Sequence, residues 1–280
     1  MRHLNPIYTA MCIIILLFTS NVLFAHGELT ARINTKTSEI SNNPEKASLY
    51  YDRGFLYQQH EEYDKALLDF NKAIEKGYSN KLVYYRIAET QKNLNNYDEA
   101  LIAVSSYFEK DANDIKIYKL KAQILIKQNR YDEALTAYNF VLKNTIDLRP
   151  DDIVEFCNII LAINPNNYED ALKIIEFGFD KMGVNSFVLR DKKIEYLIVM
   201  NLTEKVLTEY NYQIENSERK ESWYYKKAVY LVSIGNNHHA IIALQQAKIS
   251  IQLLNPRFQQ TPIIKQLIAN IKVLEKPLEK

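Results

Sequence analysis

Cysteine is nearly absent from this sequence, which has two thiols, Cys12 and Cys157. Cys12 lies within an apolar N-terminal stretch, so a chain that loses this stretch keeps one thiol and forms no internal disulfide. Its stability must then come from packing. Cys157 stands in an apolar, helix-like run over residues 153–160, and we expect it to be a small buried core residue. The alternative is a thiol that pairs between chains or reacts.

Glycine and proline are also scarce, at 6 and 7 residues in 280. Few helix breakers, together with much Leu, Ile, Ala, Lys and Glu, favour an all-helical chain. No charge of one sign dominates, because 35 basic residues face 34 acidic ones. A nucleic-acid-binding protein needs a basic surplus to neutralise phosphates, so we expect no nucleic acid among the partners.

The first 25 residues are typical of a signal peptide rather than of a folded domain. Arg2 and His3 precede an uncharged stretch that ends at Ala25, and its most apolar part spans 11–18. This core is shorter than the roughly 20 apolar residues of a membrane-spanning helix. We therefore predict a signal peptide over 1–25 and a periplasmic or secreted protein. The alternative is an uncleaved N-terminal helix, the one case in which the membrane becomes a partner.

A short pattern returns at a fixed interval along the chain. Each copy has Tyr, an acidic residue and then Ala-Leu, and its alanines are Ala66, Ala100, Ala134 and Ala171. The first three alanines are 34 residues apart, and the fourth follows 37 residues later. This period is typical of stacked repeats, because one unit alone cannot bury its apolar face.

The residues at fixed positions within each unit resemble the tetratricopeptide repeat. That family stacks antiparallel helix pairs, with a bulky residue at position 4, a small one at 8, an aromatic at 11, alanine at 20 and 27, and an aromatic or apolar residue at 24. The unit that begins at Ala47 matches all six positions, with Tyr50, Gly54, Tyr57, Ala66, Phe70 and Ala73. Further units begin at Lys81, Ile115 and Glu221, and Gln91, Tyr107 and Val141 depart from the pattern.

The spacing of these positions has a physical reason. Positions 4, 8 and 11 share one face of the first helix, and positions 20, 24 and 27 share one face of the second. Small residues at 8 and 20 let the two backbones approach closely. Asp64, Asp98 and Asp132 fall at the start of the second helix, where carboxylates interact favourably with the helix dipole.

The resemblance implies a right-handed α-solenoid of antiparallel helix pairs. We predict a lead-in helix over 26–46, a solenoid of about six helix pairs over 47–257 and a C-terminal capping helix over 258–280. The units over 151–219 are degenerate, because they keep the apolar period but few of the small residues.

No group of residues suggests catalysis, so we expect no enzyme activity, no small-molecule substrate, no cofactor and no metal site. His238 and His239 are adjacent and diverge, which suits solvated turn residues better than metal ligands. Gly178 and Gly183 have the spacing of a phosphate loop, but Val184 follows where Lys is needed.

In the family that the repeat resembles, the first helix of each pair lines the concave surface that binds partners. Positions 5, 9 and 12 of the first three units share one face of these helices. Aromatic and long polar side chains there suit an extended peptide or a partner helix. The alternative is that they pack between units or meet water. The candidate residues are Tyr51, Phe55, Gln58, Tyr85, Glu89, Lys92, Lys119 and Gln123, with Ile126 completing the third set.

The leading hypothesis is therefore an exported, non-catalytic scaffold that binds a protein or peptide in its concave groove. An alternative is a structural subunit of a cell-envelope complex that contacts its partners through the degenerate repeats, 151–219. An enzyme or an accessory subunit of one is the third possibility.

Overall fold

A computed structural model describes residues 27–278, all of whose regular elements are helices. The predicted signal peptide, 1–25, lies outside these residues. The chain divides into two compact units, Met1–Asp147 and Leu148–Lys280, called the first and second units below. Within the described range, no helix is both long and apolar enough to cross a membrane.

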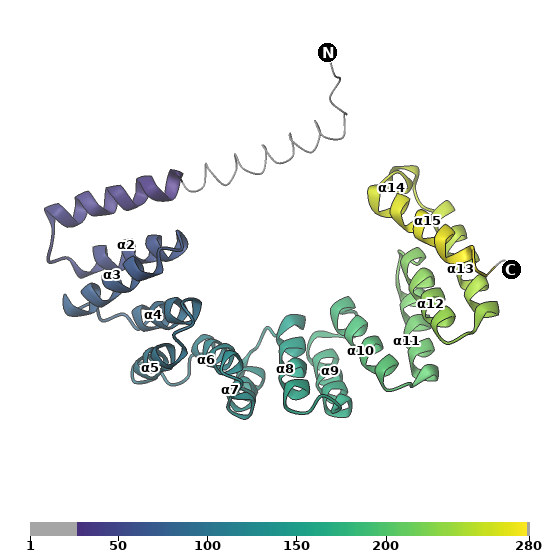
Figure 1. Ribbon diagram of the computed structural model, residues 1–280, viewed down its shortest axis with the longest axis horizontal. Helices are drawn as coiled ribbons and strands as arrows, with labels where there is room; N and C mark the ends of the chain where they lie inside the picture. The colour runs from purple at the N-terminus through teal and green to yellow at the C-terminus, as the bar shows by residue number, and fades with distance from the viewer. Residues whose placement is uncertain (1–26, 279–280) are drawn as a thin grey trace, which may run out of the picture. The chain divides into compact units, whose positions relative to one another are not determined.

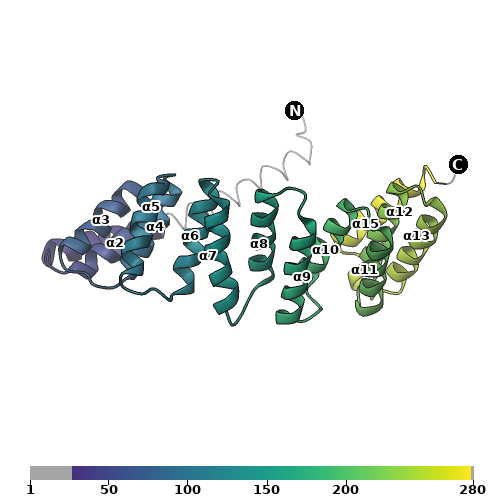
Figure 2. The same ribbon diagram turned by 90° about the horizontal axis from the view of Figure 1, so that it is seen from below.

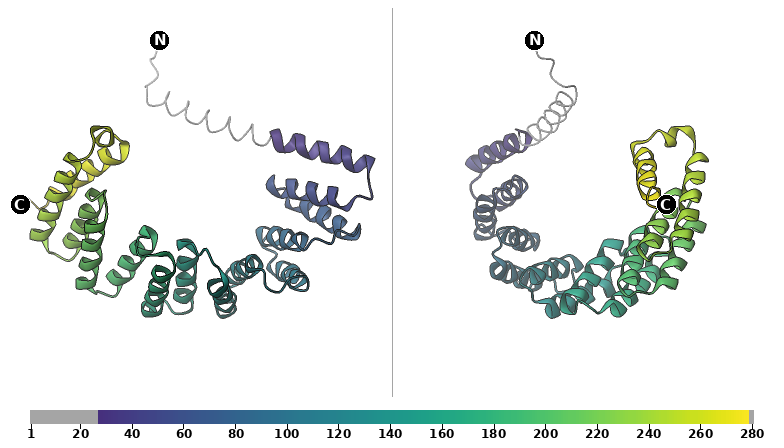
Figure 3. Two further views of the ribbon diagram at one scale, coloured as in Figure 1. Left: turned by 180° about the vertical axis from the view of Figure 1, so that it is seen from behind. Right: turned by 45° about the vertical axis from the view of Figure 1, so that its right-hand side comes forward.

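The described part of the first unit consists of a helix over 27–42 followed by three helix pairs (Figure 1). The lead helix, purple in Figure 3, lies along the first helix of the next pair. Ile40 packs with Leu49 and Tyr50 there, and Arg53 donates a hydrogen bond to Thr37 at 3.2 Å. The pairs are α2 (Ala47–Gln59) with α3 (Tyr63–Glu75), α4 (Leu82–Asn93) with α5 (Tyr97–Phe108), and α6 (Ile115–Lys127) with α7 (Tyr131–Asn144).

The second unit continues the same alternation, and Figure 2 shows α8 to α13 succeeding one another in sequence order. The predicted all-α architecture of tetratricopeptide-like helix pairs is confirmed. The pairs are α8 (Pro150–Ile163) with α9 (Tyr168–Met182), α10 (Phe187–Val199) with α11 (Thr203–Asn216), and α12 (Glu221–Ser233) with α13 (Asn237–Gln252). A short α14 (Pro256–Gln259) and a longer α15 (Pro262–Glu275) follow.

The turn within most helix pairs adopts a left-handed backbone conformation at one residue. In the turn after α4, Asn95 has φ 63°, and the next amide, of Asn96, donates to the carbonyl of Gln91 at 2.9 Å. This bond satisfies a carbonyl that the end of the helix leaves unpaired. The same conformation recurs at Glu61, Asn129, Asn201 and Gly235.

Fully buried small residues bring the two helices of a pair together. Ala66, Ala100 and Ala134 have no exposed surface. At Gly54 an added Cβ would lie 2.9 Å from the ring of Phe70. Overlap at that distance forces a neighbour to move, so this position excludes larger residues.

Tyr107 stands where the repeat usually has alanine, and it is fully buried. Its hydroxyl donates a hydrogen bond to Asp114, whose carboxylate also accepts from Lys81 Nζ at 3.0 Å. Asp114 in turn caps α6 by accepting from the amide of Lys116. The large side chain therefore links α5 to the start of the next pair.

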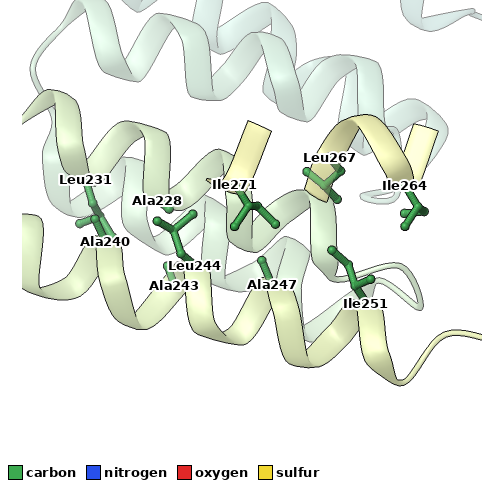
Figure 4. Close-up of a cluster of buried hydrophobic side chains, with 10 residues drawn as sticks. All are labelled: Ala228, Leu231, Ala240, Ala243, Leu244, Ala247, Ile251, Ile264, Leu267 and Ile271. Carbon is green, nitrogen blue, oxygen red and sulfur yellow. The ribbon is translucent and has the colours of Figure 1, made fainter. Parts of the chain in front are cut away.

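The helix α15 covers the apolar face of the last pair (Figure 4). Ile264, Leu267 and Ile271 belong to one buried cluster with Ala247 and Ile251 of α13. Without α15 these apolar side chains would meet water, which explains why the sequence remains amphipathic after the last repeat.

The pair α10–α11 keeps the repeat register but changes its key residues. Asn201 lies 34 residues before Gly235, so the turns of α10–α11 and α12–α13 are equivalent. Counting in this register, the small residues at positions 8, 20 and 27 become Ile194, Val206 and Gln213. α10 and α11 still pack against each other and against the neighbouring helices, although these positions no longer hold small residues.

Arg190 takes position 4 of this pair, where the other readable units have tyrosine. It is nearly fully buried, and its Nη1 lies 2.5 Å from Glu209 Oε2. Its guanidinium also lies 3.9 Å from the ring centroid of Tyr212 and 4.8 Å from that of Phe179. A charged arginine that stacks on aromatic rings thus takes the packing position that tyrosine occupies in the other readable units.

The expectation for Cys157 agrees with its place in the second unit. Its side chain is fully buried, and its Sγ lies 3.4 Å from the carbonyl oxygen of Ala171. Burial raises the pKa of the Cys157 thiol to about 12. Because the thiolate is the reactive form, this cysteine is unreactive at neutral pH.

Replacing Ala100 by leucine is expected to lower the free energy of unfolding by about 1–3 kcal/mol, because the site has no room for three more carbons. Thermal and urea unfolding followed by circular dichroism measures the change. Ala31→Leu is the matched control, since Ala31 is exposed on the helix over 27–42 of the same unit. Equal stability of both variants would contradict close helix approach at Ala100.

Removing Glu209 leaves the buried charge of Arg190 without its carboxylate partner. Glu209→Ala is therefore expected to cost about 3–5 kcal/mol. The exposed pair Lys173–Asp170, 2.7 Å apart, supplies the control, and Lys173→Ala should leave the unfolding midpoint unchanged. The comparison is made by urea unfolding, and a midpoint for Glu209→Ala equal to that of the control would show that the buried pair does not stabilise α10–α11.

Candidate functional site

The eight predicted binding residues all lie on the first helix of a pair in the first unit. α2 carries Tyr51, Phe55 and Gln58, α4 carries Tyr85, Glu89 and Lys92, and α6 carries Lys119 and Gln123. The structure places α4 against both α2 and α6. One continuous face therefore runs over the three helices, and we call it the α2–α4–α6 face.

The two aromatic residues of α2 differ in their surroundings. Tyr51 stacks on Tyr78, with ring centroids 4.6 Å apart and planes at 15°, and also packs against Phe70. The ring of Phe55 lies beneath the guanidinium of Arg86, 4.3 Å from its centroid. Tyr51 therefore contributes to packing within the unit, whereas Phe55 forms part of a stacked, half-buried surface.

A cavity of about 300 Å³ adjoins Phe55 between α2 and the helix over 27–42. Its walls are Arg32, Thr35, Lys36, Asp52, Phe55 and Leu56. Lys36 lies 3.5 Å from Asp52 across it. The lead helix thus closes one end of the α2–α4–α6 face with charged groups.

Gln58 links α2 to α4 and is nearly fully buried. Its Nε2 donates to Glu89 Oε2 at 3.0 Å and to Thr90 Oγ1 at 3.0 Å. Glu89 also forms an ion pair with Arg86 at 2.9 Å. Gln58 is thereby used in packing between the helix pairs α2–α3 and α4–α5, and the accessible polar group at this point is the Arg86–Glu89 pair.

The next link joins α4 to α6. Tyr85 packs edge-on to Tyr107, and burial is the main cause that raises the pKa of the Tyr85 hydroxyl. Lys92 Nζ lies 3.3 Å from Gln123 Oε1. Lys92, Gln123 and Lys119 are all half-buried. This part of the α2–α4–α6 face offers long polar side chains of moderate exposure.

Sequence reasoning missed Arg86. It lies next to Tyr85 in sequence, outside positions 5, 9 and 12, yet its guanidinium lies over both the Phe55 and Tyr85 rings, 4.3 and 5.7 Å from their centroids. Its buried Nε has no hydrogen-bond partner among the described residues. The signal in the sequence was Arg86 beside Tyr85, about one repeat after the aromatic residue Phe55.

The described residues contain no group of three or more His, Cys, Asp and Glu side chains that could hold a metal ion. His238 and His239 lie at the start of α13, and His239 Nδ1 is 2.8 Å from Asn236 Oδ1. The α2–α4–α6 face combines aromatic rings, one arginine and paired charges. Such a surface can bind another chain by stacking and hydrogen bonds.

Comparison with known proteins supports the repeat assignment. No curated protein matches the sequence. Residues 57–124 match the family model described as Tetratricopeptide repeat. A tetratricopeptide repeat protein from Parabacteroides merdae is similar in fold, with a TM-score of 0.53 at 13% identity, covering 92% of this chain and 97% of that one.

The pilF protein of Pseudomonas aeruginosa is also similar, with a TM-score of 0.50 at 14% identity over 81% of this chain and 98% of that one. At these identities the likeness shows the fold. Together with the 34-residue pattern, the family match identifies residues 57–124 as tetratricopeptide repeat sequence.

Proposed function

We propose that this chain is an exported, non-catalytic scaffold that binds a protein or peptide along the α2–α4–α6 face. The observation that supports it most directly is the stack of Phe55, Arg86 and Tyr85. Aromatic residues and arginine are the side chains that contribute most to binding at protein interfaces. The tetratricopeptide repeat itself supports a protein-interaction scaffold.

The chemistry of this face suits an extended peptide or a partner helix. Tyr51 and Gln58 already have partners inside the unit, so the accessible groups are Phe55, the Arg86–Glu89 pair and Lys92. From α2 to α4 these groups offer first an apolar surface, at Phe55, and then polar groups, at the Arg86–Glu89 pair and Lys92. A chain lying across them would bury side chains on Phe55 and pair polar groups with Glu89 and Lys92.

Export is the second part of the proposal. It is supported by the charged start, the short apolar core and the small residue at Ala25. N-terminal sequencing of the protein recovered from its source cell tests it. A chain that begins at His26 supports export, and one that begins at Met1 contradicts cleavage.

The double variant Phe55→Ala, Lys92→Glu is expected to weaken partner binding by about tenfold or more, since it removes a stacking ring and reverses a charge on one face. Neither residue is fully buried, so the helices should remain folded. Binding is measured by pull-down with the purified chain and then by titration of the captured partner.

The matched control is Ile102→Ala, Lys143→Glu, which makes the same kinds of change on α5 and α7, the second helices of their pairs. Both control positions are exposed. A partner retained by the control and lost by the double variant supports the α2–α4–α6 face. A partner that both variants retain at full affinity shows that binding occurs elsewhere.

A structural subunit of an envelope complex, contacting its partners through residues 151–219, is the second candidate function. It is favoured by α10, which exposes about half of the side-chain surface of Val188 and Val199. Exposed aliphatic residues on one helix are typical of contact surfaces when they cluster. A stable, stoichiometric assembly that Val188→Ser, Val199→Ser disrupts would support this candidate over the first.

A further inference from the structure

A pocket in the second unit is lined by residues that do not belong to the α2–α4–α6 face. Its volume is about 710 Å³, and it is formed by the loop before α10, the starts of α10 and α12, the end of α11 and the loop between α11 and α12. The residues that determine its chemistry are Phe187, Gln213, Glu218, Trp223, Asp191 and Lys226.

One wall of this pocket is aromatic. The rings of Phe187 and Trp223 are stacked, with centroids 6.2 Å apart and planes at 18°. Phe187 is 55% exposed, and its neighbour Val184, which also lines the pocket, is 51% exposed. Large apolar side chains so exposed beside a concave surface offer area that an apolar ligand group can cover.

The pocket also contains an amide that makes no hydrogen bond within the described part of the chain. Gln213 lines the pocket, and the residue as a whole is 4% exposed. Its amide nitrogen and oxygen are not among the fully buried polar atoms, so they remain accessible from the pocket. The repeat register makes the residue more unusual, because the equivalent positions in the first and last readable units are Ala73 and Ala247. The packing of a helix pair therefore does not require glutamine here.

The charges around the pocket leave one carboxylate unpaired. Asp191 forms an ion pair with Lys226 at 2.8 Å, and Arg219 pairs with Glu221 at 2.6 Å. Among the described residues, Glu218 has no hydrogen bond or ion pair. Lys226 and Arg219 are thus paired with carboxylates, which disfavours binding of a phosphate-bearing ligand. The unpaired carboxylate of Glu218 favours a positively charged group on the ligand.

We propose that this pocket binds a short extended peptide of a partner protein. An apolar or aromatic side chain of the peptide packs on Phe187 and Trp223, and a neighbouring lysine or arginine pairs with Glu218. The carboxamide of Gln213 bonds a main-chain amide, for which it offers both a donor and an acceptor. The site is independent of the α2–α4–α6 face, so neither proposal rests on the other.

The lone tryptophan makes the proposal directly measurable, because Trp223 is the single Trp in the sequence. The probe is the blocked peptide acetyl-Ala-Lys-Phe-Ala-Ala-amide, titrated into the purified chain while tryptophan emission is recorded. A saturable change with a dissociation constant below about 10 mM is expected. Peptides with alanine in place of phenylalanine, or glutamate in place of lysine, should bind several-fold more weakly.

Gln213→Ala tests the role assigned to the amide. It installs the residue that the repeat prefers at this position, so the unfolding midpoint should not fall. Loss of one hydrogen bond should weaken peptide binding about three- to tenfold. Gln245→Ala on α13 is the matched control, since Gln245 is exposed and outside the pocket, and it should bind as the unchanged chain does.

Three results would overturn the proposal: no saturable change up to about 10 mM peptide, equal binding of the lysine and glutamate peptides, or full affinity in Gln213→Ala. The Phe55→Ala, Lys92→Glu variant separates the two sites. It should give the unchanged tryptophan response, and a lost response would show that the peptide binds along the α2–α4–α6 face instead of in this pocket.

Discussion

Close approach of two helix backbones is the interaction on which each repeat depends. Gly54 and Ala66 have no bulk to hold α2 and α3 apart, and a Cβ at Gly54 would already overlap Phe70. Once α2 and α3 pack closely, their orientation relative to each other is fixed, and side chains of α2 contact those of α4. The stack of Phe55 and Arg86, on which the proposed function rests, lies at this contact between α2 and α4.

The pair α10–α11 shows what happens when this interaction is given up. Isoleucine, valine and glutamine replace the small residues, and an ion pair between Arg190 and Glu209 fills space that tyrosine fills elsewhere. Desolvation of the two charged groups offsets much of the attraction in such a buried pair. The pocket that contains Gln213 and the Phe187–Trp223 wall lies at this degenerate repeat.

The helix pairs could be predicted because each depends on local, periodic signals. Ala66, Ala100 and Ala134 marked the close contacts, and Asp64, Asp98 and Asp132 marked the starts of the second helices. The candidate site could be located but not resolved. The spacing of residues did not predict the hydrogen bonds from Gln58 to Glu89 and Thr90, or the stacking of Arg86 on Phe55. These contacts join side chains of neighbouring helix pairs, about one repeat apart in the sequence. The pocket at Gln213 was missed because its walls come from separate helices and loops, whose relative placement only the fold supplies.

The inaccessible sulfur of Cys157 has a practical consequence for spectroscopy. A chain without residues 1–25 carries no other cysteine, and this one stays protonated at neutral pH within the interior of the second unit. A cysteine introduced on any exposed helix surface would be alkylated ahead of it. Dyes or spin labels can therefore be placed at pairs of chosen sites, and distances across the array measured, without first removing the native thiol.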